Sequence, residues 1–172
     1  MTDTATLTYL HAALKEVQDT VRSYDAKAQI CGIGYIFAIG IVTAIGELNP
    51  DQPPFTPTVV AVSWLVVMVP IMMFGAVLYP TRAVAPRLGE QPDNVARTFY
   101  RDRERFQGVD GYIEKLDGAD LSRELAYEIL KSSGLRNLKR QRFLRALYAA
   151  AASFAFICAA QMLRAAGVTL LH

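Results

Sequence analysis

The sequence contains few of the residues that most enzymes use for catalysis. Its 172 residues include two histidines, two cysteines and one tryptophan, and His11 and His172 lie near opposite ends of the chain. No Walker loop, HExxH, CxxC or nucleophile-elbow motif is present. Cys31 and Cys158 both lie in apolar runs, where free cysteine behaves as a small apolar residue. We therefore predict a protein that is not an enzyme, with no metal, no disulfide and no resident cofactor.

Charged residues are absent from the middle of three long apolar runs, at about 28–48, 58–78 and 146–163. Each run has roughly the 20 residues that a helix needs to cross a hydrocarbon core about 30 Å thick. Backbone polar groups at that depth must be paired within the segment, which favours helix throughout. Transporters and proton relays usually carry an ionisable residue there. The runs therefore predict an all-α integral membrane protein with three transmembrane helices and no charged relay.

Lys and Arg are also absent from residues 49–57, whereas residues 81–145 hold eleven Arg and three Lys of the 18 basic residues. Basic residues accumulate in cytoplasmic loops. We therefore predict a multi-pass membrane protein with a cytoplasmic N-terminus and a C-terminus on the outer side. The expected parts are a cytoplasmic amphipathic helix (1–27), a transmembrane hairpin (28–80) with a short outer loop (49–57), a cytoplasmic helical segment (81–145), and a third span with an outer C-terminus (146–172).

An apolar stripe precedes the first span. Its spacings alternate between three and four residues, as in a heptad repeat, at Leu7, Leu10, Leu14, Val17, Val21, Tyr24 and Ala28. No Gly or Pro interrupts residues 4–31, so one continuous helix is expected to enter the membrane. Two partners fit the stripe: the chain's own cytoplasmic helices, or a parallel coiled coil with other copies.

Small residues recur within the first and third spans. They are Gly32, Gly34, Gly40 and Gly46 in the first span, and Ala151, Ala155 and Ala159 in the third. Small side chains let membrane helices approach closely, either within one subunit or between subunits. Together with the stripe, they lead us to expect a homo-oligomer.

The inner segment is expected to be helical in its second half. Asp120 is a suitable N-cap for a last helix that runs into the third span. Its predicted apolar stripe comprises Leu121, Leu125, Ile129 and Leu130, and later Leu135, Leu138 and Phe143. Residues 95–107 and 108–116 are expected to form shorter helices.

Basic residues gather just before the third span, at Lys139, Arg140, Arg142 and Arg145. We expect this cluster at the membrane surface, where it would either contact anionic lipid or bind a phosphate that approaches from inside. Arg164, near the outer end of the same span, is expected to reach the surface; a pore-lining role is the alternative.

Several short motifs then occur in a characteristic order. They are DAKAQ at 25–29, LYPTR at 78–82, Phe99-Tyr100, GYIEKL at 111–116, ELAYEIL at 124–130, and Lys139 with basic neighbours. This order resembles the Pycsar transmembrane effector family over nearly the whole chain. One departure is Pro80-Thr81-Arg82, where the family usually has Pro-Arg.

The resemblance implies an antiphage role and a location in the inner membrane, so that the outer C-terminus would be periplasmic. A partner cyclase would make cyclic CMP or cyclic UMP on infection, and the effector would sense this activating ligand and compromise the inner membrane. The partners it implies are the lipid bilayer and the cyclic nucleotide, with no nucleic acid. Two alternatives remain: an oligomeric membrane adaptor that recruits a cytoplasmic partner, and a holin-like pore former.

A site for such a ligand needs a cation for the single phosphate and an aromatic face for the base. The candidates in the inner segment are Tyr100, Arg101, Tyr112, Lys115, Lys139, Arg140 and Arg142. Arg142 is the first choice, because a ligand there could act directly on the third span.

Overall fold

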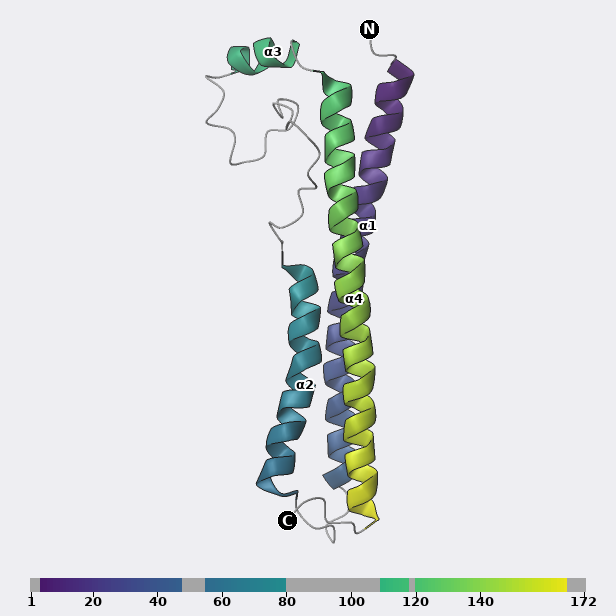
Figure 1. Ribbon diagram of the computed structural model, residues 1–172, viewed down its shortest axis with the longest axis vertical. Coiled ribbons are helices and arrows are strands. Elements are labelled where there is room, and N and C mark those ends of the chain that lie inside the picture. Colours follow the sequence, from purple (N-terminus) through teal and green to yellow (C-terminus); the bar gives the residue numbers. More distant parts are fainter. Residues whose placement is uncertain (1–3, 48–54, 80–108, 118–119, 167–172) are drawn as a thin grey trace. The chain divides into compact units, whose positions relative to one another are not determined.

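The computed structural model describes residues 4–47, 55–79, 109–117 and 120–166 (Figure 1). Over these residues the regular structure is entirely helical, with α1 at Thr4–Glu47, α2 at Pro57–Leu78, α3 at Val109–Asp117 and α4 at Leu121–Ala165. Three of these helices, α1, α2 and α4, are long and apolar enough to cross a membrane. The predicted all-α architecture with three membrane-spanning helices is therefore confirmed.

The chain divides into two compact units. One comprises Met1–Val21 and Thr81–Asn137 and is called here the α3 unit. The other comprises Arg22–Pro80 and Leu138–His172 and is called the three-helix unit. The helices α1 and α4 each contribute their first part to the α3 unit and the rest to the three-helix unit.

The helix ends follow from local sequence. The carboxylate of Asp120 accepts a hydrogen bond from the Arg123 backbone N–H at 3.2 Å, which confirms the predicted N-cap of α4. Thr56 caps α2 in the same way, accepting from the Val59 N–H at 3.4 Å. Pro57 then occupies the first position of α2, where its missing N–H has no cost. The predicted continuity of α1 from the stripe into the first span is also confirmed.

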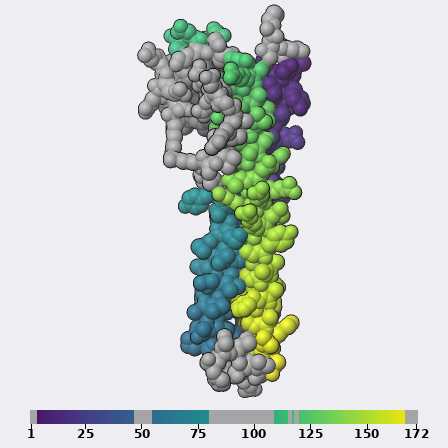
Figure 2. All heavy atoms as spheres, viewed as in Figure 1, coloured from purple at the N-terminus to yellow at the C-terminus, as the bar shows by residue number. Residues whose placement is uncertain are grey.

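Small and aromatic residues form the core of the three-helix unit, in which α2 runs antiparallel to α1 and α4 (Figure 1). Figure 2 shows α2 and α4 packed against each other. The buried residues are Ala28, Tyr35, Ile39, Phe74, Val77, Ala146, Ala150 and Ile157. The Phe143 ring lies between those of Tyr24 and Phe74, with centroids 6.1 Å and 6.3 Å away. Small side chains on α1 and α4 thus leave room for aromatic rings at the helix contacts.

The heptad stripe of α1 is partly covered within a single chain. In the α3 unit Leu14 is buried, and Leu7, Leu10, Val17 and Val21 are half-buried. This burial fits packing against the chain's own helices. A coiled coil between copies stays a prediction.

The predicted apolar stripe of α4 is wrong at Leu130, which is 53% exposed. The buried positions in this part of α4 are Glu124, Leu125, Tyr127 and Glu128. Leu130 follows Leu125 by five positions. At about 3.6 residues per turn, this spacing places the Leu130 side chain well away from the buried face. The face that carries Leu125 therefore buries two glutamates.

Candidate functional site

A partly buried ion pair joins α1 and α4 at one end of the three-helix unit. The Lys139 ammonium hydrogen-bonds the Asp25 carboxylate. The Lys139 side chain is only 7% exposed, whereas that of Asp25 is 33% exposed. Of the four basic residues expected at the membrane surface, Lys139 is therefore buried between helices instead of facing lipid.

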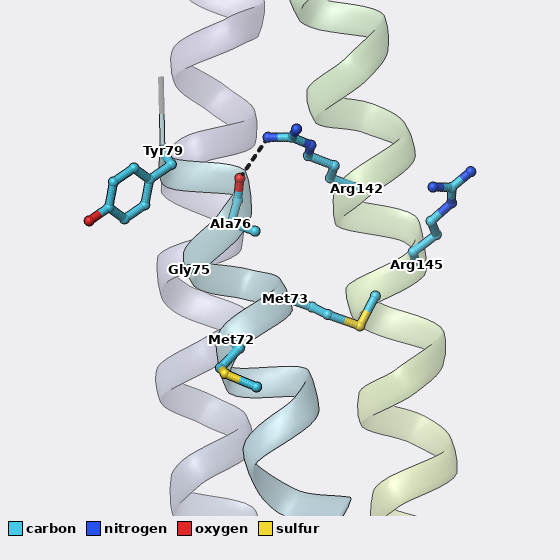
Figure 3. A pocket seen from close by; sticks show the side chains of 7 residues that line it. All are labelled: Met72, Met73, Gly75, Ala76, Tyr79, Arg142 and Arg145. Carbon is cyan, nitrogen blue, oxygen red and sulfur yellow. Dashed lines mark hydrogen bonds between the residues drawn. The ribbon is translucent and has the colours of Figure 1, made fainter. Parts of the chain in front are cut away.

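Arg142, one turn further along α4, contacts the last turn of α2. Its guanidinium donates a hydrogen bond to the Ala76 carbonyl oxygen at 3.0 Å (Figure 3). The last four carbonyls of a helix lack partners within that helix, and they carry the negative end of its dipole. Because α2 has no basic residue in its own last turn, Arg142 supplies the missing donor and the opposing charge from another helix.

A cavity of about 580 Å³ lies beside this contact. Its lining comprises Met72, Met73, Gly75, Ala76 and Tyr79 at the end of α2, and Arg142 and Arg145 on α4. Figure 3 shows Arg142 pointing toward α2, while Tyr79 points away from α4. The volume is within the range of about 300–1,000 Å³ that is usual for small-molecule sites. The cavity presents hydrogen-bond donors from α4, a carbonyl acceptor from α2 and a deformable methionine wall.

A second polar contact lies among the apolar side chains of the spans. The Tyr35 and Ser153 hydroxyls are 2.5 Å apart, and both residues are buried. This hydrogen bond joins α1 to α4 across 118 positions of sequence. Sequence reasoning missed the pairing, as it missed Asp25 as the partner of Lys139. The available signal was the presence of isolated polar residues in or next to apolar runs.

The structure brings together only some of the predicted ligand-binding residues. Lys139 and Arg142 lie one turn apart on α4, at the same end of the three-helix unit. Arg140 is exposed and does not line the cavity. Tyr112 and Lys115 are on α3, in the other unit, and Tyr100 and Arg101 lie outside the described residues. Their assignment to a nucleotide site stays a prediction.

The small residues divide into half-buried ones that pack against another helix and exposed ones. Gly32 packs against α2, since a Cβ added there would lie 3.4 Å from the Phe74 Cβ. Gly40, Ala151, Ala155 and Ala159 are exposed in the single chain. Gly46 lies close to α4, since a Cβ added there would overlap the Gln161 amide. Within one subunit Gly32 and Gly46 therefore have the predicted close-approach role, and the expected oligomer stays a prediction.

These features define a three-span helical membrane protein with a basic cluster at one end of its spans and, among the described residues, no group of metal ligands. A model of the Pycsar effector protein domain family matches residues 9–166, and the chain belongs to this family. The resemblance found in the sequence is thereby confirmed. No curated protein and no solved structure matches the chain.

Family membership establishes the broad function. The chain is an antiphage effector located in a membrane, of a family associated with a cyclic-nucleotide signal from a cyclase. The family consists of membrane effectors and has no known enzymatic activity.

Proposed function

We propose that this effector is activated by a cyclic pyrimidine mononucleotide, cyclic CMP or cyclic UMP, and then disrupts the inner membrane of the infected cell. One observation carries the proposal: Lys139 and Arg142, one turn apart on α4, hold α1 and α2 at one end of the three spans. On the predicted topology this is the cytoplasmic end. A ligand made in the cytoplasm would meet it first.

The chemistry of the cavity suits such a ligand. A cyclic mononucleotide carries one negative phosphate, and the planar guanidinium of Arg142 can donate two parallel hydrogen bonds to phosphate oxygens. A pyrimidine ring also carries N–H donors, for which the terminal carbonyls of α2 are acceptors. The methionine side chains of Met72 and Met73 give the ring an adaptable apolar wall.

Binding would act on the spans through competition for the same cations. A phosphate on Arg142 competes with the Ala76 carbonyl, and one near Lys139 competes with the Asp25 carboxylate. Contacts between helices are then exchanged for contacts with the ligand, so the nucleotide binds better to a state in which α2 is released from α4. A ligand shifts two states only by such a difference in affinity. Separation of α2 from α4 at this end would open the bilayer-spanning core.

The test combines binding and leakage. Calorimetric titration of the purified protein should show binding of cyclic CMP or cyclic UMP at submillimolar concentration. Liposomes that contain the protein and a trapped dye should leak when that nucleotide is added, and not when cyclic AMP is added. Arg142→Ala should weaken nucleotide binding at least about tenfold, because a charge-assisted hydrogen bond contributes about 1.5–3 kcal/mol. Because this variant also loses the contact with the Ala76 carbonyl, it should leak more than the wild type without nucleotide and respond less to added nucleotide. Arg123→Ala serves as the control, because this exposed arginine of α4 lies outside the cavity.

The other outcomes distinguish the alternatives. If neither nucleotide binds, the sensing proposal fails. If a nucleotide binds normally to Arg142→Ala, the site lies elsewhere. Leakage of the wild-type protein at full rate without any nucleotide identifies a holin-like pore former. Nucleotide-independent recruitment of a soluble protein without leakage identifies an adaptor.

A further inference from the structure

The start of α2 and the end of α4 lie at the same end of the three-helix unit (Figure 1). A second cavity is lined by residues from these two helix ends and from α1. Its volume is about 420 Å³, and all three helices contribute to its lining. The apolar walls include Ile39 of α1, Val60 and Val67 of α2, and Ile157 of α4. The interior therefore suits a hydrocarbon group.

The same cavity has a cation among its lining residues. Arg164, in the last turn of α4, places its guanidinium carbon 4.6 Å from the centroid of the Phe55 ring. An aromatic face holds a guanidinium in place, and the guanidinium keeps its positive charge there. The cavity thus joins an apolar interior to a positioned positive charge, which is the pattern that complements an anionic amphiphile.

A buried acceptor lies beside the cation. Gln161 lines the cavity one turn before Arg164, and its Oε1 is buried without a hydrogen-bond partner. Its amide packs directly against Gly46 of α1, in space that a Cβ at position 46 would occupy. A buried acceptor without a partner is unfavourable, so an occupant that brings a hydroxyl donor is favoured.

We propose that this cavity binds one anionic phospholipid with hydroxyl groups on its head, as in phosphatidylglycerol. One acyl chain lies between the apolar walls, the phosphate contacts Arg164, and a head-group hydroxyl donates toward Gln161. The position agrees with this occupant, because the ends of membrane-spanning helices lie at the depth of the lipid head groups. An inorganic phosphate would leave the apolar walls uncovered.

The chain carries its own reporter for this binding. Trp64 is its one tryptophan, lines the cavity and is 65% exposed. Phosphatidylglycerol with brominated acyl chains, titrated into the detergent-solubilised protein, should quench Trp64 fluorescence saturably. It should reach half-quenching at a concentration roughly fivefold lower than brominated phosphatidylcholine, as one basic residue implies.

Two variants test the assignment. Arg164→Gln should abolish the preference for phosphatidylglycerol, and Ser63→Phe, which places a ring in the cavity, should abolish saturable quenching by both lipids. Arg123→Gln and Val62→Phe are matched controls, because both positions are exposed and lie outside this cavity. Each control should keep the wild-type preference. Far-ultraviolet circular dichroism establishes that each variant retains its helices.

The competing explanations give different results. Glycerol phosphate, which has the head group without acyl chains, should not displace the brominated lipid at millimolar concentration. Complete displacement would show a site for a soluble phosphate ester and overturn the proposal. Equal quenching by the two lipids in the wild type, or an unchanged preference in Arg164→Gln, would also overturn it.

Discussion

Removing Asp25 and removing Lys139 from their ion pair should have unequal effects on stability. The Lys139 side chain is 7% exposed and that of Asp25 is 33% exposed, so the two partners differ in what is left when the other is removed. Asp25→Asn leaves an ammonium buried without its counter-charge. Lys139→Met leaves a carboxylate that water can reach. We therefore expect Asp25→Asn to be the more destabilising change.

The magnitude follows from this burial. Removing one partner of a fully buried ion pair costs about 3–5 kcal/mol, whereas an exposed pair contributes about 0–1 kcal/mol. Because one side chain here is buried and the other is a third exposed, Asp25→Asn should cost about 2–3 kcal/mol. That corresponds to a decrease in melting temperature of roughly 5–10 °C for a chain of this size. Lys139→Met should cost about 1 kcal/mol or less, since methionine retains most of the packing.

Two native cysteines allow the thermal unfolding of these variants to be measured with a thiol-reactive dye. Cys31 and Cys158 are free and half-buried, and Cys31 packs against the core of the three-helix unit. A dye that becomes fluorescent on reacting with thiols should report the unfolding of this unit during heating in detergent. Lys15→Met is the control, because Lys15 is exposed on α1, and it should melt as the wild type does.

The double variant completes a double-mutant cycle for this ion pair. Asp25→Asn combined with Lys139→Met removes both charges and should be more stable than Asp25→Asn alone, with a coupling energy of about 2 kcal/mol. Two results would refute the reasoning: a cost below about 0.5 kcal/mol for Asp25→Asn, or additive effects of the two substitutions.

Three further predictions concern the spans. Tyr35→Phe should lower stability by about 0.6–1.7 kcal/mol in the same thermal assay, as for other hydrogen bonds between membrane helices, and no change would contradict the buried contact. Gly32→Leu should destabilise the unit, because its Cβ would already lie 3.4 Å from the Phe74 Cβ and the rest of the leucine side chain would have no room. Gly40→Leu should preserve the fold, because nothing lies within 4 Å of its Cβ, and it should weaken assembly as measured by light scattering. Unchanged assembly would show that Gly40 is not in a subunit interface. A cysteine placed at Gln52 in a cysteine-free background should react with a membrane-impermeant thiol reagent added from outside. If that cysteine does not react, the predicted topology is the reverse of the real one.

The features that were predictable from sequence are those set by neighbouring residues. Three spans follow from apolar runs of sufficient length, and the α4 start follows from an Asp placed before a helical segment. The long α1 follows from the absence of Gly and Pro over residues 4–31. Even the failure at Leu130 is local, because five-residue spacing takes a side chain off the buried face.

The contacts of the candidate site were not predictable in this way, since they join distant parts of the chain. Lys139 and Asp25 are 114 positions apart, and neither periodicity nor composition pairs them. Arg142 was selected for its position before the third span, yet its partner is a backbone carbonyl. Every residue has a backbone carbonyl, so the sequence does not indicate which one accepts the hydrogen bond. Fold class is therefore readable from local pattern, whereas the pairing of polar groups between helices requires the structure.

The contact between Arg142 and α2 also constrains biogenesis. Arg142 lies 66 residues after Ala76, so the ribosome completes α2 well before it synthesises the side chain that satisfies this carbonyl. The contacts of α1 at Asp25 and Tyr35 likewise wait for α4. The hairpin of the first two spans therefore enters the bilayer as an unfinished intermediate, and arrival of the last helix completes it. A chain that terminates before α4 would leave the hairpin without these three contacts.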